Sequence, residues 1–289
     1  MVSNIHNLPE PLIIALSPER NRPLDKRISV TALIDAPLRR ILLKRHFDDI
    51  SEDASENLWA LLGKAVHYVI EKGSDAAEEK IEVPCHGATL VGVIDWHKDG
   101  RVIDWKITSV WSIIFTEGKN YELQLQVYAY LLWLSGKPVN SLAVNAILRD
   151  WNKREAQKNP DYPVIPFVEI PFTPWPAEKI EAYVKERVEL HLEAETFPGD
   201  IPEKFWCSPE ERWTKPTKYA VKREGMERAV RVVDTEEAAI KIMASEEERK
   251  KGKYSIEVRP GEDTHCESYC NVEPWCPFRH PKNPDVGTK

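Results

Sequence analysis

Residues 92–107, GVIDWHKDGRVIDWKI, form a strand–turn–strand pattern that fixes how the two halves must pair. The pair Asp99-Gly100 favours a two-residue hairpin turn, because both residue types tolerate the left-handed backbone that such a turn needs. With that turn, Asp95 is expected directly across the hairpin from Asp104. The sequence therefore predicts two carboxylates side by side at positions where a strand usually holds packing residues.

One face of this hairpin is acidic, because side chains alternate between the two faces of a strand. That face carries Asp95, Asp104 and Lys106, and we expect it to be exposed while Trp105 faces the core. Like charges directly opposite on a sheet are destabilising, and a multivalent cation between them would reverse the effect. Carboxylates together with water molecules are suitable ligands for Mg²⁺ or Mn²⁺. Lys106 would then orient a water molecule or stabilise negative charge that develops on a phosphate. An exposed acidic face without a function is the alternative.

Two expected helices add polar side chains to this pattern. His67 lies in the helix expected at 54–73, and one imidazole with two carboxylates is a sensible shell for Mn²⁺ or Mg²⁺. Gln124 and Tyr128 lie four residues apart in the helix expected at 120–135, so they share one face. A glutamine on so apolar a helix needs a polar partner or a ligand. The alternatives are a structural histidine and a core tyrosine.

Composition limits the kinds of function that the chain can have. With 289 residues and 42% hydrophobic residues it can bury a core, and its net charge of −7 argues against a general nucleic-acid coat. A local basic groove stays open, because residues 39–45 hold four basic and no acidic side chains. Residues 212–231 hold seven basic and two acidic side chains with Trp213 and Tyr219 between them, which suits stacking on a single strand. A solvated surface is the alternative.

The chain shows no apolar run long enough to span a membrane and no phosphate-binding loop of the G-x-x-x-x-G-K-[ST] type. We therefore expect a cytoplasmic protein that has no membrane partner and no ATP-driven motor. The pattern of residues along the chain changes after residue 196, which predicts a domain boundary there. We expect an irregular segment at 1–28 and a C-terminal extension at 197–289 with a basic hairpin and a cysteine cluster.

Three cysteines near the end have a C-x₃-C-x₅-C spacing, and the odd total of five disfavours a disulfide framework. The expected ligand set comprises Cys207, Cys266, Cys270 and Cys276. Four thiolates can hold a [4Fe–4S] cluster or Zn²⁺, and unliganded thiols are the alternative. Cys85 is expected to be a small core residue.

Four short motifs follow one another in the order of a known family. They are G-x-x-x-H at 63–67, G-V-I-D at 92–95, D-W-K at 104–106 and Q-L-Q-V-Y at 124–128. Over residues 29–175 the chain resembles the PD-(D/E)xK nucleases, in the RecB-like branch of CRISPR-associated and phage recombination exonucleases. The resemblance implies an α/β fold, with a restriction-endonuclease-like core at 29–196 whose mixed central sheet is flanked by helices.

The same resemblance implies roles for the residues already singled out. The metal, Mg²⁺ or Mn²⁺, would be held by His67, Asp95, Asp104 and the backbone carbonyl of Trp105. Lys106 would be catalytic together with Asp95 and Asp104, while Gln124 and Tyr128 would orient the DNA strand. The reaction would be metal-dependent hydrolysis of a phosphodiester.

The resemblance further implies a DNA exonuclease that acts on linear ends in recombination, repair or phage DNA processing. Its setting would be the cytoplasm of a bacterial or phage-infected cell, with a recombination or repair protein as a candidate partner. Some family members hold an iron–sulfur cluster with a cysteine upstream of the motifs, which the stretch 31–40 of this chain lacks. A catalytically silent DNA-binding subunit and a site-specific endonuclease stay open as alternatives. The sequence does not determine the oligomeric state.

Overall fold

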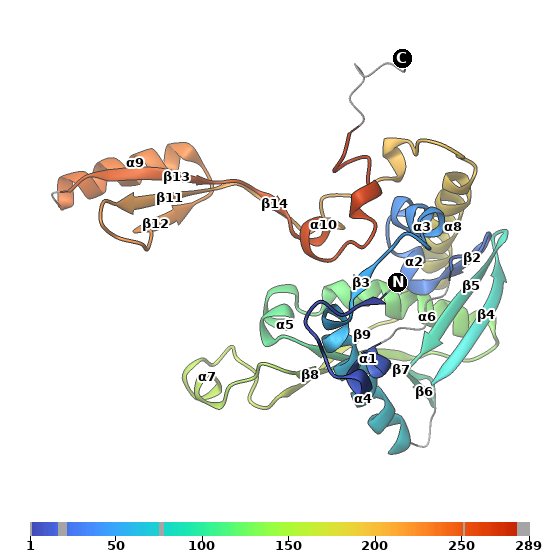
Figure 1. Ribbon diagram of the computed structural model, residues 1–289. Coiled ribbons are helices and arrows are strands. Elements are labelled where there is room, and N and C mark those ends of the chain that lie inside the picture. The colour runs from blue at the N-terminus through green and yellow to red at the C-terminus, as the bar shows by residue number, and fades with distance from the viewer. Residues whose placement is uncertain (1, 17–21, 75–77, 251, 282–289) are drawn as a thin grey trace, which may run out of the picture. The chain divides into compact units, whose positions relative to one another are not determined.

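The computed structural model describes residues 2–16, 22–74, 78–250 and 252–281. They belong to two compact units, Met1–Trp206 and Cys207–Lys289 (Figure 1). The division at residue 196 into independently folding parts stays a prediction. Residues 1–28 are not irregular throughout, since their described part contains β1 (Val2–Ser3), α1 (Glu10–Leu16) and the start of β2 (Arg27–Ser29).

Helices and strands alternate along the rest of the N-terminal unit. Its further helices are α2 (Val30–Leu33), α3 (Pro37–Arg45), α4 (Leu58–Lys72), α5 (Val110–Thr116), α6 (Glu122–Leu134), α7 (Lys153–Lys158) and α8 (Ala177–Glu195). Its further strands are β3 (Glu52–Asp53), β4 (Glu79–Cys85), β5 (Ala88–Ile94), β6 (Trp96–Lys98), β7 (Arg101–Thr108), β8 (Ser141–Leu148) and β9 (Phe167–Phe172). In the described ranges of the chain, no helix has the length and apolar character needed to cross a membrane.

Two sheets of mixed direction form the centre of this unit. The larger has the order β6-β7-β8-β9, with β7 and β8 parallel and the outer pairs antiparallel. The smaller has the order β2-β5-β4, with β2 and β5 parallel. A parallel pair needs a long crossover, and the helices α5 and α6 provide it between β7 and β8. This arrangement confirms the predicted α/β class with mixed sheets and flanking helices.

Helix α6 is the central helix of the core. Every residue from Leu125 to Leu132 is buried, which is typical of a helix covered on all sides. Its buried neighbours come from both sheets and from α2 and α8. The fully buried large side chains include Ile28, Leu33, Leu90, Ile94, Leu125, Leu131, Leu132, Leu142 and Ile180.

The hairpin turn has the predicted register, with Trp96 paired to Ile103 and Lys98 to Arg101. Both turn residues have left-handed φ angles, 50° at Asp99 and 76° at Gly100, as the two-residue turn requires. The predicted pairing of Asp95 with Asp104 is wrong in its detail. Strand β5 ends at Ile94, so Asp95 lies at the bend where the chain leaves one sheet and joins the other as β6.

The predicted exposure of the two hairpin faces is also wrong. Asp104 is only 3% exposed, whereas Trp105 is half-buried. Both faces of β7 are covered, because α4 packs on the face of Trp105 and α6 packs on the face of Asp104 and Lys106. When both faces of a strand are covered, the alternation of apolar and polar residues along it does not reveal which face belongs to the core.

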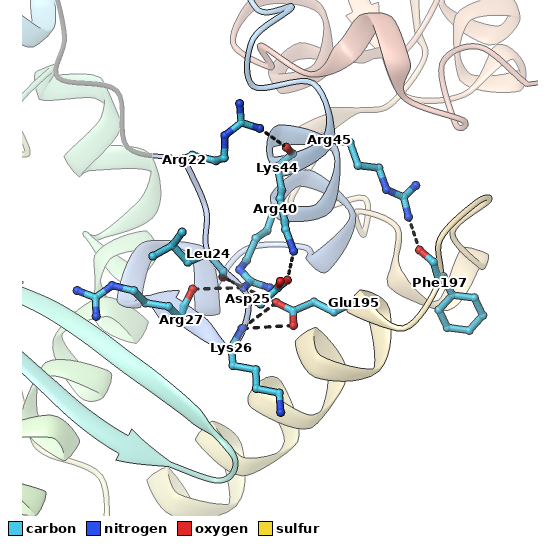
Figure 2. A network of polar contacts seen from close by, with 10 residues as sticks. All are labelled: Arg22, Leu24, Asp25, Lys26, Arg27, Arg40, Lys44, Arg45, Glu195 and Phe197. Carbon is cyan, nitrogen blue, oxygen red and sulfur yellow. Dashed lines mark hydrogen bonds and ion pairs between the residues drawn. The ribbon is translucent and has the colours of Figure 1, made fainter.

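The basic residues of α3 do not form a free surface. Arg39 pairs with Asp35, Arg40 with Glu195 and Lys44 with Asp25, and Arg45 donates to the carbonyls of Phe197 and Gly199. Figure 2 shows how several of these contacts join α3 to the end of α8 and to the segment before β2. The four cations at 39–45 thus make contacts inside the unit, which weakens the case for the local basic groove that the sequence left open.

The C-terminal unit contains a small α+β arrangement. Its elements are β10 (Thr214–Lys215), β11 (Lys218–Arg223), β12 (Arg231–Val233), α9 (Glu236–Arg249), β13 (Tyr254–Arg259), β14 (Glu262–Asp263) and α10 (Thr264–Ser268). Strands β12, β11 and β13 form an antiparallel sheet, and β11–β12 is the predicted hairpin.

Carboxylates that lie later in the sequence pair with four of the seven basic residues of 212–231. The ion pairs are Arg212–Asp263, Lys215–Glu262, Lys218–Asp234 and Lys222–Glu257. The excess of basic residues that the sequence shows at 212–231 is therefore much smaller once the chain is folded. This region is a weaker candidate for phosphate contacts than its local composition indicates.

The buried ion pair of α3 gives a first test of the fold. The Arg40 guanidinium lies 2.5 Å from the Glu195 carboxylate and also donates to the carbonyls of Leu24 and Arg27. We expect Arg40→Ala to lower the free energy of unfolding by about 3–5 kcal/mol, because it leaves a buried carboxylate without its cation. Arg39→Ala is the control, and its half-exposed pair should contribute less than about 1 kcal/mol. Equal effects of the two variants in urea unfolding would contradict this account.

A buried histidine gives the fold a defined pH dependence. Burial and the charges of Arg187 and Arg40 lower the pKa of His191 to about 3, and its Nε2 lies 3.3 Å from the Leu33 carbonyl. The unfolded chain binds a proton at His191 below pH ~6.5, while the folded protein does not. Stability is therefore complete above that pH and falls as the pH is lowered towards 3, by about 2 kcal/mol at pH 5.

The variant His191→Gln isolates this contribution. The drop in unfolding free energy between pH 7 and pH 5, measured with urea, should be about 2 kcal/mol smaller in the variant than in the wild type. An equal drop in both proteins would show that His191 is protonated in the folded state.

Candidate functional site

Three elements and one bend of the N-terminal unit bring the predicted site residues together. Strand β7 carries Asp104, Trp105 and Lys106, helix α4 carries His67, helix α6 carries Gln124 and Tyr128, and Asp95 lies at the bend between β5 and β6. Hydrogen bonds and ion pairs connect these residues in two groups, one at the edge of β7 and one on the face that α6 covers.

The first group surrounds the peptide of Trp105. The Trp105 N–H donates to Asp95 Oδ2 at 2.8 Å, and His67 Nε2 lies 3.1 Å from the Trp105 carbonyl oxygen. The other ring nitrogen of His67, Nδ1, lies 3.5 Å from Asp95 Oδ1. The hydrogen bond with the Asp95 carboxylate raises the pKa of His67 above its ordinary value, although burial opposes this. The imidazole therefore holds its proton more firmly than an isolated histidine would.

The second group is built on the buried carboxylate of Asp104. Its Oδ2 lies 2.6 Å from Lys106 Nζ and is otherwise buried without a hydrogen-bond donor. Desolvation raises the pKa of Asp104, and the nearby Asp95 carboxylate adds to this rise, whereas the Lys106 ammonium lowers it. The site therefore concentrates negative charge that a cation can stabilise.

Helix α6 holds the Lys106 side chain in place. Lys106 Nζ lies 3.4 Å from Gln124 Oε1, and Gln124 Nε2 donates to the Tyr128 hydroxyl at 2.8 Å. Burial raises the pKa of Tyr128, so the hydroxyl stays neutral at ordinary pH. The helix comes this close because Gly92 has no side chain: a Cβ there would lie 2.9 Å from Leu131 Cδ1 and 3.3 Å from the Tyr128 ring.

The donor groups of the first site fit a small divalent cation. An imidazole nitrogen and a carbonyl oxygen are already neighbours here, with 3.1 Å between His67 Nε2 and the Trp105 carbonyl oxygen. The carboxylates of Asp104 and Asp95 add the hard oxygen donors that Mg²⁺ and Mn²⁺ prefer. In the part of the chain that the structure describes, no group of three or more His, Cys, Asp or Glu side chains already converges on one point. The ligand roles therefore stay a prediction.

Two carboxylates near this site are absent from the sequence-based prediction. Glu71 and Glu78 line the same small cavity as His67 and Asp95. Glu71 follows His67 by four residues on α4, so helical spacing could have revealed it. Glu78 lies outside any element before β4, and no pattern in the sequence indicates its position.

The cysteines of the C-terminal unit are reduced, with Cys266 and Cys276 buried and Cys207 and Cys270 half-buried. Burial and the neighbours Cys270, Asp263 and Cys276 raise the pKa of Cys266 to about 11. No metal-binding group of three such residues exists among the described residues, so the structure does not support the predicted iron–sulfur or zinc centre.

Comparisons with known proteins give one family and two similar structures. The family model that describes the PD-(D/E)XK nuclease superfamily matches residues 16–277. The solved structure of SSO0001 is similar at a TM-score of 0.42 and 20% identity, covering 63% of this chain and 85% of that chain. LHK-Exo in complex with dAMP is similar at a TM-score of 0.34 and 16% identity, covering 64% of this chain and 92% of that chain. No curated protein matches the chain.

The contact between His67 and Asp95 can be tested without an activity assay. In metal-free protein, NMR titration of the His67 ring should give a midpoint above the ordinary value of about 6.5. Asp95→Asn should lower this midpoint, because the amide carries no charge to stabilise the imidazolium. Adding Mg²⁺ should also lower it if the cation competes with the proton for the ring. A midpoint that Asp95→Asn leaves unchanged would exclude the contact, and the buried His191 is the internal reference.

Proposed function

Since the chain belongs to the PD-(D/E)XK nuclease superfamily, we propose that it is a metal-dependent deoxyribonuclease that removes nucleotides from linear DNA ends. The observation that carries this proposal is the grouping of Asp95, Asp104 and Lys106 around the Trp105 peptide, with both carboxylates close enough for their charges to interact. The exonuclease mode rests on the order of the four sequence motifs. The biological setting in recombination, repair or phage DNA processing stays a prediction.

The residues that would hold Mg²⁺ or Mn²⁺ are His67, Asp95, Asp104 and, through its carbonyl, Trp105. A bound divalent ion would polarise a phosphoryl oxygen and lower the pKa of a coordinated water. The protein itself contributes by holding the metal ligands in fixed positions. The main chain of β7 positions the Trp105 carbonyl oxygen, and the Asp95 carboxylate contacts both the Trp105 N–H and the His67 ring.

Lys106 would act on the phosphate and its attacking water. Its ammonium group lies between the Asp104 carboxylate and the Gln124 amide oxygen, so two acceptors orient its three donors. A cation held in advance at that position stabilises the negative charge that develops on a phosphate, without reorganisation during the reaction. Gln124 is itself held by the Tyr128 hydroxyl, and these two residues would keep the lysine aligned.

The two alternatives differ from the main proposal in defined ways. A silent DNA-binding subunit has no need for a lysine beside the buried Asp104, and the presence of Lys106 favours an enzyme. A site-specific endonuclease would use the same groups but would cut circular DNA as well as linear DNA.

The decisive experiment is digestion of end-labelled linear DNA with Mg²⁺ and with Mn²⁺. Lys106→Ala and Asp104→Asn should each lower the cleavage rate by at least about 100-fold, because each removes a charge from the site of reaction. Lys119→Ala is the matched control, since that lysine pairs with Glu117 on the surface and should leave the rate unchanged.

Closed circular DNA of the same sequence separates the alternatives. Resistance of the circle with loss of label from the linear form indicates an exonuclease, and cutting of the circle indicates an endonuclease. Wild-type protein that binds DNA and cuts neither form would favour the silent subunit.

A further inference from the structure

Three large aromatic side chains lie exposed near the carboxyl end of the strand that carries Lys106. On α5, which follows β7, Trp111 is 48% and Phe115 is 78% exposed, and in the first turn of α4 Trp59 is 64% exposed. Exposed aromatic surface of this extent usually marks a binding site rather than a structural need. The proposed catalytic residues do not include any of the three.

Hydrogen bonds fix these aromatic residues to one edge of the larger sheet. The Arg149 N–H, just beyond β8, donates to the carbonyl of Thr108 at the end of β7 at 3.0 Å. The Asp150 carboxylate then accepts from the Ser109 hydroxyl at 2.6 Å and from the Val110 N–H at 2.7 Å. These bonds hold the start of α5 against the end of β8, so the helix cannot turn freely about the end of β7.

The two α5 rings pack on each other and stay exposed to solvent, Phe115 more than Trp111. Trp111 packs edge-on against the buried Tyr162, with 6.0 Å between ring centroids. On its other side it stacks with Phe115 at 5.8 Å and an interplanar angle of 24°. The stack is therefore anchored at one end in the core and open at the exposed Phe115.

The third aromatic residue is combined with a cation. The Arg149 guanidinium lies 4.3 Å from the centre of the Trp59 ring. Because the Arg149 N–H is bonded to Thr108, this pair belongs to the same edge as α5. In the described ranges of the chain, no carboxylate forms an ion pair with Arg149.

Three further cations on α4 and α7 also lack an ion pair within the described residues. In the same described ranges, no ion pair involves Lys64 on α4, or Lys153 and Arg154 at the start of α7. The basic residues of α3 and of β11 differ, because most of them are paired with carboxylates. Cations without a carboxylate partner, together with exposed aromatic rings, suit a ligand that has both phosphates and flat bases.

Building on the proposed function, we propose that Trp59 with Arg149, and Trp111 with Phe115, form a stacking platform for the unpaired bases of a single DNA strand. Trp111 follows Lys106 by five residues, and the Arg149 N–H donates to the carbonyl of Thr108, two residues beyond Lys106, so the platform is tied to the end of β7 that follows the proposed site of cleavage. Bases in a duplex are already stacked and paired, so their faces are closed to these rings. The platform therefore selects a single-stranded end as the substrate.

The test compares binding of a labelled single strand and of a duplex of the same sequence, by fluorescence anisotropy in EDTA to prevent cleavage. Trp59→Ala and the double variant Trp111→Ala/Phe115→Ala should each weaken single-strand binding by at least about fivefold. Duplex binding should change by less than about twofold, because the rings do not reach paired bases.

Tyr68→Ala is the matched control. Tyr68 lies on the same helix as Trp59, is 60% exposed and also has a cation, Lys72, over its ring. It lies nine residues further along α4, about 13 Å away from the platform, so its removal should leave both affinities unchanged. Thermal unfolding verifies the fold of each variant. If the double variant does not fold, Phe115→Ala alone decides, since that side chain is the most exposed of the three.

The outcomes separate this proposal from the proposed function. Unchanged single-strand binding in all platform variants overturns the platform, even when the wild type cleaves DNA. Equal losses for single strand and duplex overturn the selection of unpaired bases. Wild-type protein that binds a single strand through the platform but cleaves no DNA overturns the nuclease proposal and supports the platform.

Discussion

The unpaired edge of β7 is the constraint on which the candidate site depends. Strand β6 is short, and its pairing with β7 ends at Trp96 and Ile103. Beyond that point the main-chain groups of Trp105 need other partners, since an unpaired buried N–H or carbonyl is costly. Asp95 accepts from the N–H, and His67 contacts the carbonyl. The side chains that complete this strand edge are therefore the ones that could bind a cation.

The face of β7 that α6 covers holds a buried negative charge that must be offset. A carboxylate as deeply buried as Asp104 is destabilised by desolvation, and the negative charge of Asp95 adds to that cost. Lys106 offsets part of it from the same strand, two residues on, where a side chain must lie on the same face. Helix α6 then keeps the lysine in position through Gln124 and Tyr128. The spacing D-x-K and the spacing Q-x-x-x-Y are thus two parts of one arrangement.

A local excess of basic residues in the sequence does not indicate which cations lack an ion pair in the folded chain. The two stretches with the largest local excess of basic residues are largely neutralised by carboxylates from elsewhere in the chain. Arg149, which forms no ion pair with a carboxylate of the described residues, lies instead at the end of β8, where the sequence shows no marked excess of basic residues. Counting charges along a segment cannot reveal this, because ion pairs form between residues that are distant in sequence.

The sequence by itself determined most of the elements, the hairpin register and the spacing of the residues that meet at the candidate site, whose roles stay a prediction. Turn preference, alternation and helical spacing are local properties, and they place Asp99-Gly100, Asp104 with Lys106, and Gln124 with Tyr128 correctly. Only the tertiary structure decided that Asp104 is buried, that Asp95 sits at a bend, and that Glu78 joins the cavity. These facts depend on which helix covers which face of a strand, and that is set by packing between distant segments rather than by the pattern within any one of them.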